Sequence, residues 1–118
     1  MKLYGIKSCD SVRKALKFLK SAEIDFQFVD IKSESVECET IEKWLKQVSI
    51  DKLFNSRGTT YRKLGLKNLN LDEEAKREWL CREKMLIKRP VAELEDGRVV
   101  VGFDEKTYKE IFNEQHSA

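Results

Sequence analysis

A cysteine between a short apolar segment and a helical segment constrains this chain more than any other feature. Residues 3–6 (LYGI) have the composition of a buried strand, and residues 12–19 carry apolar side chains at helical spacing. Asp10 and Ser11 are both good N-cap residues, so the helix is predicted to begin at one of them. Cys9 is therefore expected at the N-terminus of the first helix.

This position offers the thiol a chemical role. Unpaired backbone N–H groups and the positive end of the helix dipole favour anions, so they stabilise a Cys9 thiolate and hold an oxyanion that approaches it. Lys7 and Arg13 add positive charge nearby. A small thiol that serves only packing is the alternative that the position leaves open.

The length and charge of the chain limit the classes of protein to consider. Its 118 residues are expected to form a single domain, 1–118, which folds without disulfides or metals. A formal charge of +2 is too small for a nucleic-acid binder recognised by charge. There is neither an apolar run long enough for a membrane span nor a signal-like N-terminus. Three cysteines that are not closely spaced in the sequence indicate the reducing cytoplasm as the compartment. We also expect the protein to be a monomer.

The order of the predicted elements is that of a thioredoxin-like fold. A second strand at 26–30 follows the first helix, so the first two strands are expected to be parallel. An Asp-Gly dipeptide between apolar runs predicts a hairpin of strands 91–94 and 98–101, and a helix follows from Asp104. The fold class is α/β, a four-stranded mixed sheet with an all-helical insertion at approximately 37–86, between strand 2 and the C-terminal hairpin.

Helical spacing and turn residues divide this insertion. Apolar residues at 41–48 predict one helix, and a loop at 55–58 is followed by a short helix after Thr59. A third helix is predicted at about 71–84, because acidic residues at its start suit a helix N-terminus.

Two arginines and the only proline are further candidates for a site. Pro90 stands at the entry of a strand, where an ordinary trans proline loses no needed hydrogen bond. In a thioredoxin-like fold, however, a cis proline here lies beside the active-site cysteine, so we expect a cis Arg89–Pro90 bond and Arg89 turned toward the thiol. Arg57 shares a loop with hydroxyls and a glycine, and guanidinium groups bind oxyanions and carboxylates through forked hydrogen bonds. A solvated surface charge is the alternative for Arg57.

Four segments together resemble the glutaredoxin-coupled arsenate reductase (ArsC) family, and most of all its YffB-like branch, proposed to contain glutathione-dependent thiol reductases. In chain order the segments are 4–12 (YGIKSCDSV), 55–64 (NSRGTTYRKL), 87–91 (IKRPV) and 101–103 (VGF). The resemblance implies that Cys9 is the nucleophile and that Arg57 and Arg89 bind an anionic substrate or glutathione. Pro90, Lys7 and Ser8 complete the expected binding set.

Two departures from the family pattern shape the expected mechanism. The third arginine of the arsenate reductases falls here on Val101, with Arg98 earlier in the same strand, which leaves fewer donors for a multiply charged oxyanion. Val12 occupies the second cysteine position of a C-x-x-C motif, so an external thiol must release any adduct on Cys9. A monothiol mechanism follows.

The remaining cysteines and the sole histidine are expected to lie outside the chemistry. Cys38 opens a predicted helix and Cys81 lies within another; structural roles are expected, and distant resolving roles are the alternative. His116 belongs to a tail, 115–118, that is predicted to fray. No metal site is expected, because the cysteines lack zinc spacing.

The leading hypothesis is a glutathione-dependent thiol reductase, an oxidoreductase with glutathione as co-substrate and no bound cofactor. One alternative is an arsenate reductase that uses the same Cys9 with glutathione and glutaredoxin. The other is an Spx-like transcriptional regulator that binds RNA polymerase, a class that usually carries the C-x-x-C switch. Glutathione and glutaredoxin are the expected partners, without nucleic acid or membrane.

Overall fold

The structure, a computed structural model, describes residues 1–34 and 36–116, with side chains to Phe112. Four strands form one sheet in the order β2-β1-β3-β4: β1 (Lys2–Gly5), β2 (Gln27–Asp30), β3 (Val91–Glu93) and β4 (Val99–Val101). β1 and β2 are parallel and joined by α1 (Asp10–Ser21), whereas the other neighbouring strands are antiparallel. The predicted mixed sheet and its thioredoxin-like α/β class are confirmed.

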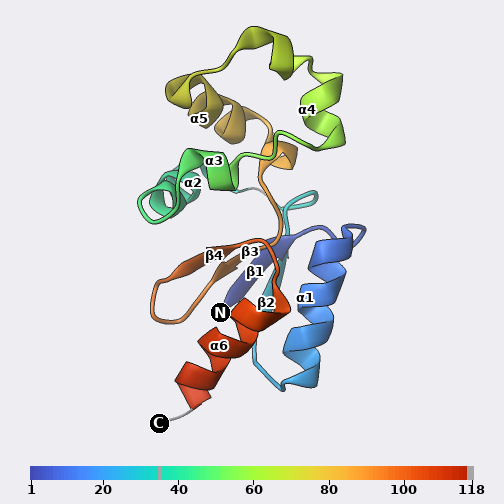
Figure 1. The fold of residues 1–118 in the computed structure, drawn as a ribbon, viewed down its shortest axis with the longest axis vertical. Coiled ribbons are helices and arrows are strands. Elements are labelled where there is room, and N and C mark those ends of the chain that lie inside the picture. The colour runs from blue at the N-terminus through green and yellow to red at the C-terminus, as the bar shows by residue number, and fades with distance from the viewer. Residues whose placement is uncertain (35, 117–118) are drawn as a thin grey trace.

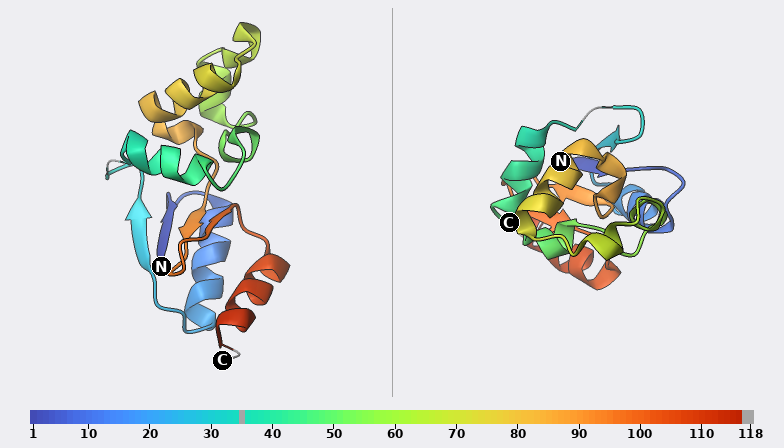
Figure 2. Two further views of the ribbon diagram at one scale, coloured as in Figure 1. Left: turned by 90° about the vertical axis from the view of Figure 1, so that its left-hand side faces the viewer. Right: turned by 90° about the horizontal axis from the view of Figure 1, so that it is seen from above.

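The helices between β2 and β3 lie together beyond one end of the sheet (Figure 1). In chain order they are α2 (Cys38–Leu45), α3 (Ile50–Leu53), α4 (Thr59–Lys63), η1 (Leu66–Leu69), α5 (Glu73–Arg82) and η2 (Lys84–Leu86). We call this segment the insertion. It makes the molecule elongated, with extents of 47 × 28 × 25 Å (Figure 2). The last helix, α6 (Glu105–His116), returns to the sheet. It includes Gln115 and His116, which were predicted to fray, and the remaining two residues of that tail, 117–118, lie outside the described residues.

The two faces of the sheet support two separate cores, because successive strand residues point to opposite sides. Leu3 faces a cluster that contains Leu19 of α1 and Tyr108 of α6. Tyr4, the next residue, faces a cluster that contains Trp44 of α2. α1 and α6 thus cover one face, and the insertion packs against the other side at the end of the sheet, through Trp44 of α2 (Figure 1).

A carboxylate on β3 joins the insertion to the sheet. Glu93 accepts a hydrogen bond from the Tyr4 hydroxyl at 2.8 Å and another from Trp44 Nε1 at 2.7 Å. The rings of Tyr4 and Trp44 also meet edge to face, with their centroids 4.9 Å apart. Burial and the bond to Glu93 raise the pKa of Tyr4 well above its ordinary value.

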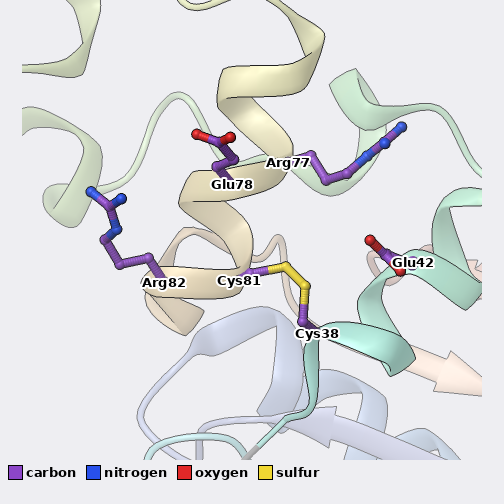
Figure 3. A pocket seen from close by; sticks show the side chains of 6 residues that line it. All are labelled: Cys38, Glu42, Arg77, Glu78, Cys81 and Arg82. Atoms are coloured by element: carbon purple, nitrogen blue, oxygen red, sulfur yellow. A yellow bond between two sulfur atoms is a disulfide. The ribbon is translucent and has the colours of Figure 1, made fainter.

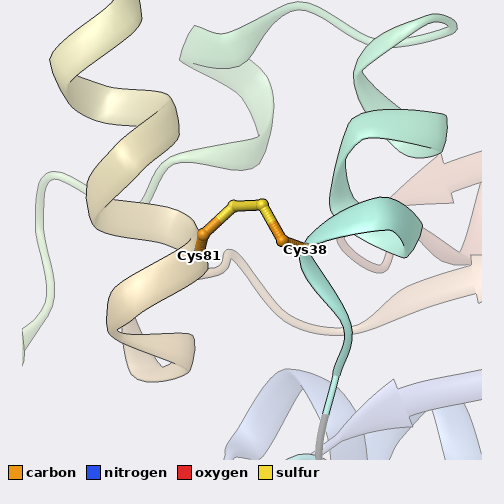
Figure 4. Close-up of a disulfide and its surroundings, with 2 residues drawn as sticks. All are labelled: Cys38 and Cys81. Atoms are coloured by element: carbon orange, nitrogen blue, oxygen red, sulfur yellow. A yellow bond between two sulfur atoms is a disulfide. The ribbon is translucent and has the colours of Figure 1, made fainter.

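A disulfide connects the first and last α-helices of the insertion (Figure 4). Cys38 begins α2 and Cys81 lies in the last turn of α5; their Cα atoms are 5.0 Å apart although they are separated by 43 positions in sequence. The expectation of three unpaired thiols is therefore wrong. Sequence spacing gave no signal of this pairing, because only the tertiary packing of α2 against α5 brings the two residues together.

Candidate functional site

Cys9 lies at the point where the chain leaves β1 and enters α1. The helix begins at Asp10, as predicted, but its N-cap residue is Cys9 rather than Asp10 or Ser11, and no side chain caps it. The backbone N–H of Arg13 donates to the Cys9 carbonyl at 3.0 Å, so the thiol stands on the first turn of the helix. Cys9 is half-buried and is the free cysteine among the described residues.

Close packing of α1 on β1 fixes this position. A Cβ atom on Gly5 would lie 2.6 Å from Val12 Cγ2, which is too close for any real contact. The absence of a side chain at Gly5 therefore allows the first turn of α1 to lie directly on the end of the strand. Cys9, in the connection between them, is held at this edge of the sheet.

Arg89 and Pro90 reach the same edge from β3. Tyr4 pairs with Val91 in an antiparallel ladder, so the two residues that precede Val91 lie beside the end of β1 from which the Cys9 connection starts. The Arg89–Pro90 peptide bond is cis, as predicted. Register therefore brings these two candidates to the edge that carries Cys9.

The guanidinium of Arg89 has unused hydrogen-bonding capacity. Its Nη1 donates to the carbonyl of Met85 at 3.0 Å, so the side chain turns back along its own chain. Its Nε is buried and has no hydrogen-bond partner within the part of the chain that the structure describes. Buried donors are normally paired, so an acceptor such as a carboxylate or an oxyanion would satisfy this group.

The Arg57 loop meets the segment to which Arg89 turns. Asn55 N donates to the carbonyl of Leu86 at 2.8 Å, and Leu86 adjoins Met85 in the chain. The side chain of Asn55 accepts from Arg57 N at 3.1 Å and shapes the turn. The base of the predicted loop and the Arg89 guanidinium therefore donate hydrogen bonds to the carbonyls of two adjacent residues, Leu86 and Met85.

The side chain of Arg57 itself is exposed and lies in a hollow of its own. The hollow has a volume of about 480 Å³, and Arg62 and Lys67 contribute further positive charge to it. Of the described residues, neither Cys9 nor Arg89 lines this hollow. The structure thus brings Arg89 and Pro90 to the edge that carries Cys9, but shows no contact between Arg57 and that group.

The sequence analysis missed the other residues of this basic hollow. Arg62 lies in α4, five positions after Arg57, and Lys67 lies in the following 3-10 turn. Four cationic side chains between positions 57 and 67, three of which line the hollow, were the available signal. Their convergence depends on the turn between α4 and η1, where Gly65 adopts a positive φ of 65°.

The charges close to Cys9 are fewer than expected. Lys7 and Ser8 are exposed in the turn before Cys9. Arg13 forms an ion pair with Asp10 on the surface of α1. The carboxylate of Asp10 therefore offsets the positive charge that Arg13 would otherwise bring, which leaves Lys7 and the helix N-terminus as the positive groups beside the thiol.

Strand register locates Val101, the position at which the resemblance to arsenate reductases implies a third arginine. Val101 pairs with Val91 and therefore lies at the site edge of the hairpin. Arg98 precedes β4 at the opposite end, where its Nε contacts Asp96 at 2.8 Å. Arg98 therefore lies away from the site edge, where Val101 stands at the position that the resemblance assigns to a third arginine.

A cysteine at the N-terminus of the first helix, beside a cis proline on a neighbouring strand, defines a thioredoxin-like thiol protein. The chain belongs to the ArsC family, whose pattern it matches over residues 4–111.

Individual relatives agree with this assignment. An uncharacterised protein of Haemophilus influenzae is 38% identical over 112 residues, which cover 93% of this chain and 96% of the relative. The solved structure of a protein called YffB superposes with a TM-score of 0.84 at 35% identity and covers 92% of this chain and 96% of its own. The global transcriptional regulator Spx 2 of Bacillus cereus is 28% identical over 88% of this chain and 80% of its own length.

The described residues lack the features of two other kinds of site. No helix within 1–34 and 36–116 has the length and apolar character needed to cross a bilayer. The same residues contain no group of three or more histidine, cysteine or acidic side chains placed to hold a metal ion.

Proposed function

We propose that this ArsC-family protein is a glutathione-dependent thiol reductase that uses Cys9 as its single nucleophile. The observation that carries the proposal is the Nε of Arg89, which is buried and has no hydrogen-bond partner among the described residues, on a residue whose backbone lies by strand register at the edge of the sheet where Cys9 caps α1. Together they provide a nucleophilic sulfur and a donor suited to a carboxylate of glutathione.

The disulfide supports a monothiol mechanism. Cys38 and Cys81 are bonded to each other, and Val12 stands where a dithiol enzyme carries its second cysteine. Cys9 therefore has no resolving thiol beside it in the chain, and an external thiol completes the cycle.

The reaction proceeds by two thiol–disulfide exchanges. The Cys9 thiolate attacks the glutathione sulfur of a mixed disulfide R–S–S–G, forms Cys9–S–S–G and releases R–S⁻, which takes up a proton. The thiolate of a second glutathione then attacks the glutathione sulfur on Cys9, which forms G–S–S–G and returns the Cys9 thiolate. Overall, the mixed disulfide is reduced to R–SH and one glutathione is oxidised.

In this mechanism the other candidates bind glutathione. Arg89 holds a carboxylate through its unpaired Nε, and the exposed Lys7 and Ser8 lie where a peptide next to Cys9 would contact them. The backbone of Arg89, the residue before the cis proline, pairs with the extended tripeptide, whereas Pro90 has no N–H and its carbonyl already accepts from Gly102 N at 2.7 Å. Arg57 contributes from the neighbouring basic hollow, with which it can bind a second carboxylate.

An arsenate reductase with the same nucleophile is the second candidate, and membership of the ArsC family favours it. Val101, at the position that the resemblance assigns to a third arginine, offers no hydrogen-bond donor to arsenate, which favours a glutathione mixed disulfide as the substrate instead. The Spx relative favours a regulator that binds RNA polymerase, but the Cys9-to-Val12 segment lacks the second cysteine of a C-x-x-C switch. As further parts of the proposal, glutaredoxin is a partner and the protein is a cytoplasmic monomer.

The decisive experiment measures reduction of a glutathione mixed disulfide, coupled to NADPH consumption by glutathione reductase. We expect turnover by the wild type and by the matched control Cys38→Ser, and none by Cys9→Ser. Arg89→Met should raise KM for the mixed disulfide at least about tenfold, because a charged hydrogen bond contributes roughly 1.5–3 kcal/mol. Equal turnover by the wild type and Cys9→Ser would refute the proposal, and arsenate-dependent NADPH consumption without mixed-disulfide reduction would favour the second candidate.

A further inference from the structure

The two cysteines that the Cys9 reaction does not use lie together at the surface of the insertion. Cys38 is exposed and Cys81 is half-buried, and their sulfur atoms are bonded (Figure 4). A hollow of about 480 Å³ lies beside the bond and is lined in part by both cysteines (Figure 3). An external thiol or disulfide can therefore reach this bond from solvent.

Opening the bond leaves the core of the insertion packed. Ile41 and Trp44 of α2 and Leu80 of α5 are fully buried in one cluster with the residues of the sheet. These apolar contacts join the two helices independently of the sulfur atoms. The bond can therefore break and form again while the protein stays folded.

The two sulfur atoms differ in environment. Cys38 is the first residue of the eight-residue helix α2, where the helix dipole and free backbone N–H groups favour a thiolate. Cys81 lies in the last turn of α5, less exposed than Cys38. Cys38 is thus the sulfur that an outside reagent meets first, and Cys81 is placed to resolve the product.

The hollow beside the bond carries charges of both signs. Glu42 of α2 and Arg77 of α5 line it on one side of the disulfide (Figure 3). On the other side, the guanidinium of Arg82 lies over the ring of Trp79, 5.1 Å from its centroid. Such mixed charge suits a zwitterionic thiol compound better than a purely anionic one.

We infer that Cys38 and Cys81 form a second thiol–disulfide centre, which exchanges with small disulfides that carry both ammonium and carboxylate groups, such as oxidised glutathione. This goes beyond the proposed function, because Cys9 takes no part. The Cys38 thiolate attacks G–S–S–G, forms Cys38–S–S–G and releases one glutathione thiolate; the Cys81 thiolate then attacks the Cys38 sulfur and releases the second. The two protein thiols lose two electrons and two protons, and the oxidised glutathione gains them. Excess glutathione reverses both steps.

The test uses the full chain with Cys9→Ser, so that only this pair reacts. The protein is reduced, freed of reductant, incubated with oxidised glutathione and followed by intact mass spectrometry and peptide mapping. We expect loss of two hydrogen atoms, no retained glutathione, and one peptide linking Cys38 to Cys81. Return of the dithiol on addition of reduced glutathione, without any change in far-ultraviolet circular dichroism, is expected as well.

Two further variants separate the roles of the sulfur atoms. Cys9→Ser/Cys81→Ser should trap one glutathione on Cys38, because the resolving thiol is missing. Cys9→Ser/Cys38→Ser should acquire glutathione on Cys81 at least about tenfold more slowly, because that sulfur is less exposed and lacks the helix N-terminus. Equal rates in the two variants would overturn the assigned roles. The proposal of a second centre would be overturned if Cys38 and Cys81 stayed reduced in oxidised glutathione, or if reduced glutathione opened their bond only after the protein unfolded. Either result would hold whatever the activity of Cys9.

Discussion

Removal of the Cys38–Cys81 bond should lower the stability of the protein by an amount that follows from the length of the loop it closes. The bond joins residues separated by 43 positions. In the chain-entropy treatment, a cross-link closing such a loop reduces the entropy of the unfolded chain by about 13 cal/mol/K, or ~4 kcal/mol at 25 °C. For a domain of this size, that corresponds to a fall of roughly 15 °C in Tm.

The assay compares urea and thermal unfolding of the oxidised wild type with Cys38→Ala/Cys81→Ala. Cys9→Ala is the matched control, because it removes a thiol that closes no loop. If reduction opens the bond in the folded protein, the wild type in excess reductant should unfold like the double variant. The reasoning would be refuted if the free energy of unfolding fell by less than about 1 kcal/mol, or if reductant left the wild type unaffected. Loop closure would then not account for the stability of the oxidised protein.

Three further outcomes follow from the core. Gly5→Ala should destabilise the protein by about 1–3 kcal/mol in urea unfolding, because its Cβ would meet Val12 Cγ2 at 2.6 Å. The same change should cost clearly less in a Val12→Ala background, which has lost the clashing methyl groups, and an equal cost in both backgrounds would contradict the clash. Tyr108→Phe should raise stability by about 1 kcal/mol at neutral pH, since it removes a buried hydroxyl that has no partner among the described side chains; a loss would indicate a hidden partner. Burial raises the pKa of Tyr108 above its ordinary value of 10.0, and burial together with the bond to Glu93 raises the pKa of Tyr4. The folded protein therefore favours the neutral, protonated form of both tyrosines, and their protonation stabilises the fold. Their contribution should be complete below pH 10 and lost as the pH rises above it, and urea unfolding of Tyr4→Phe/Tyr108→Phe should show a flatter alkaline decline.

Features encoded within a short stretch of sequence could be predicted. The Asp-Gly turn and its flanking valines correctly predicted the hairpin of β3 and β4, because the turn residues and the apolar runs are adjacent in the chain. The start of α1 at Asp10 was also correct, but the capping residue was not. Propensity favours Asp or Ser at a cap, whereas here the fit of α1 against Gly5 fixes where the helix starts.

Features that depend on distant segments were beyond prediction from the sequence. The bond between Cys38 and Cys81 requires α2 to pack against α5, and no local pattern reports that contact. The turn of Arg89 back to Met85 and the separate hollow around Arg57 likewise depend on how the insertion folds. The sequence therefore named candidate residues, but not the groups that they contact.

The disulfide also makes a covalent ring of the chain from Cys38 to Cys81. Leu64 and Leu69, which are 41% and 57% exposed, belong to this ring, in the stretch between α4 and α5. A protease that cuts there would leave a nicked molecule that migrates as one species until a reductant divides it in two. The gel pattern of such a digest, run with and without reductant, would report the state of the bond in protein taken directly from cells.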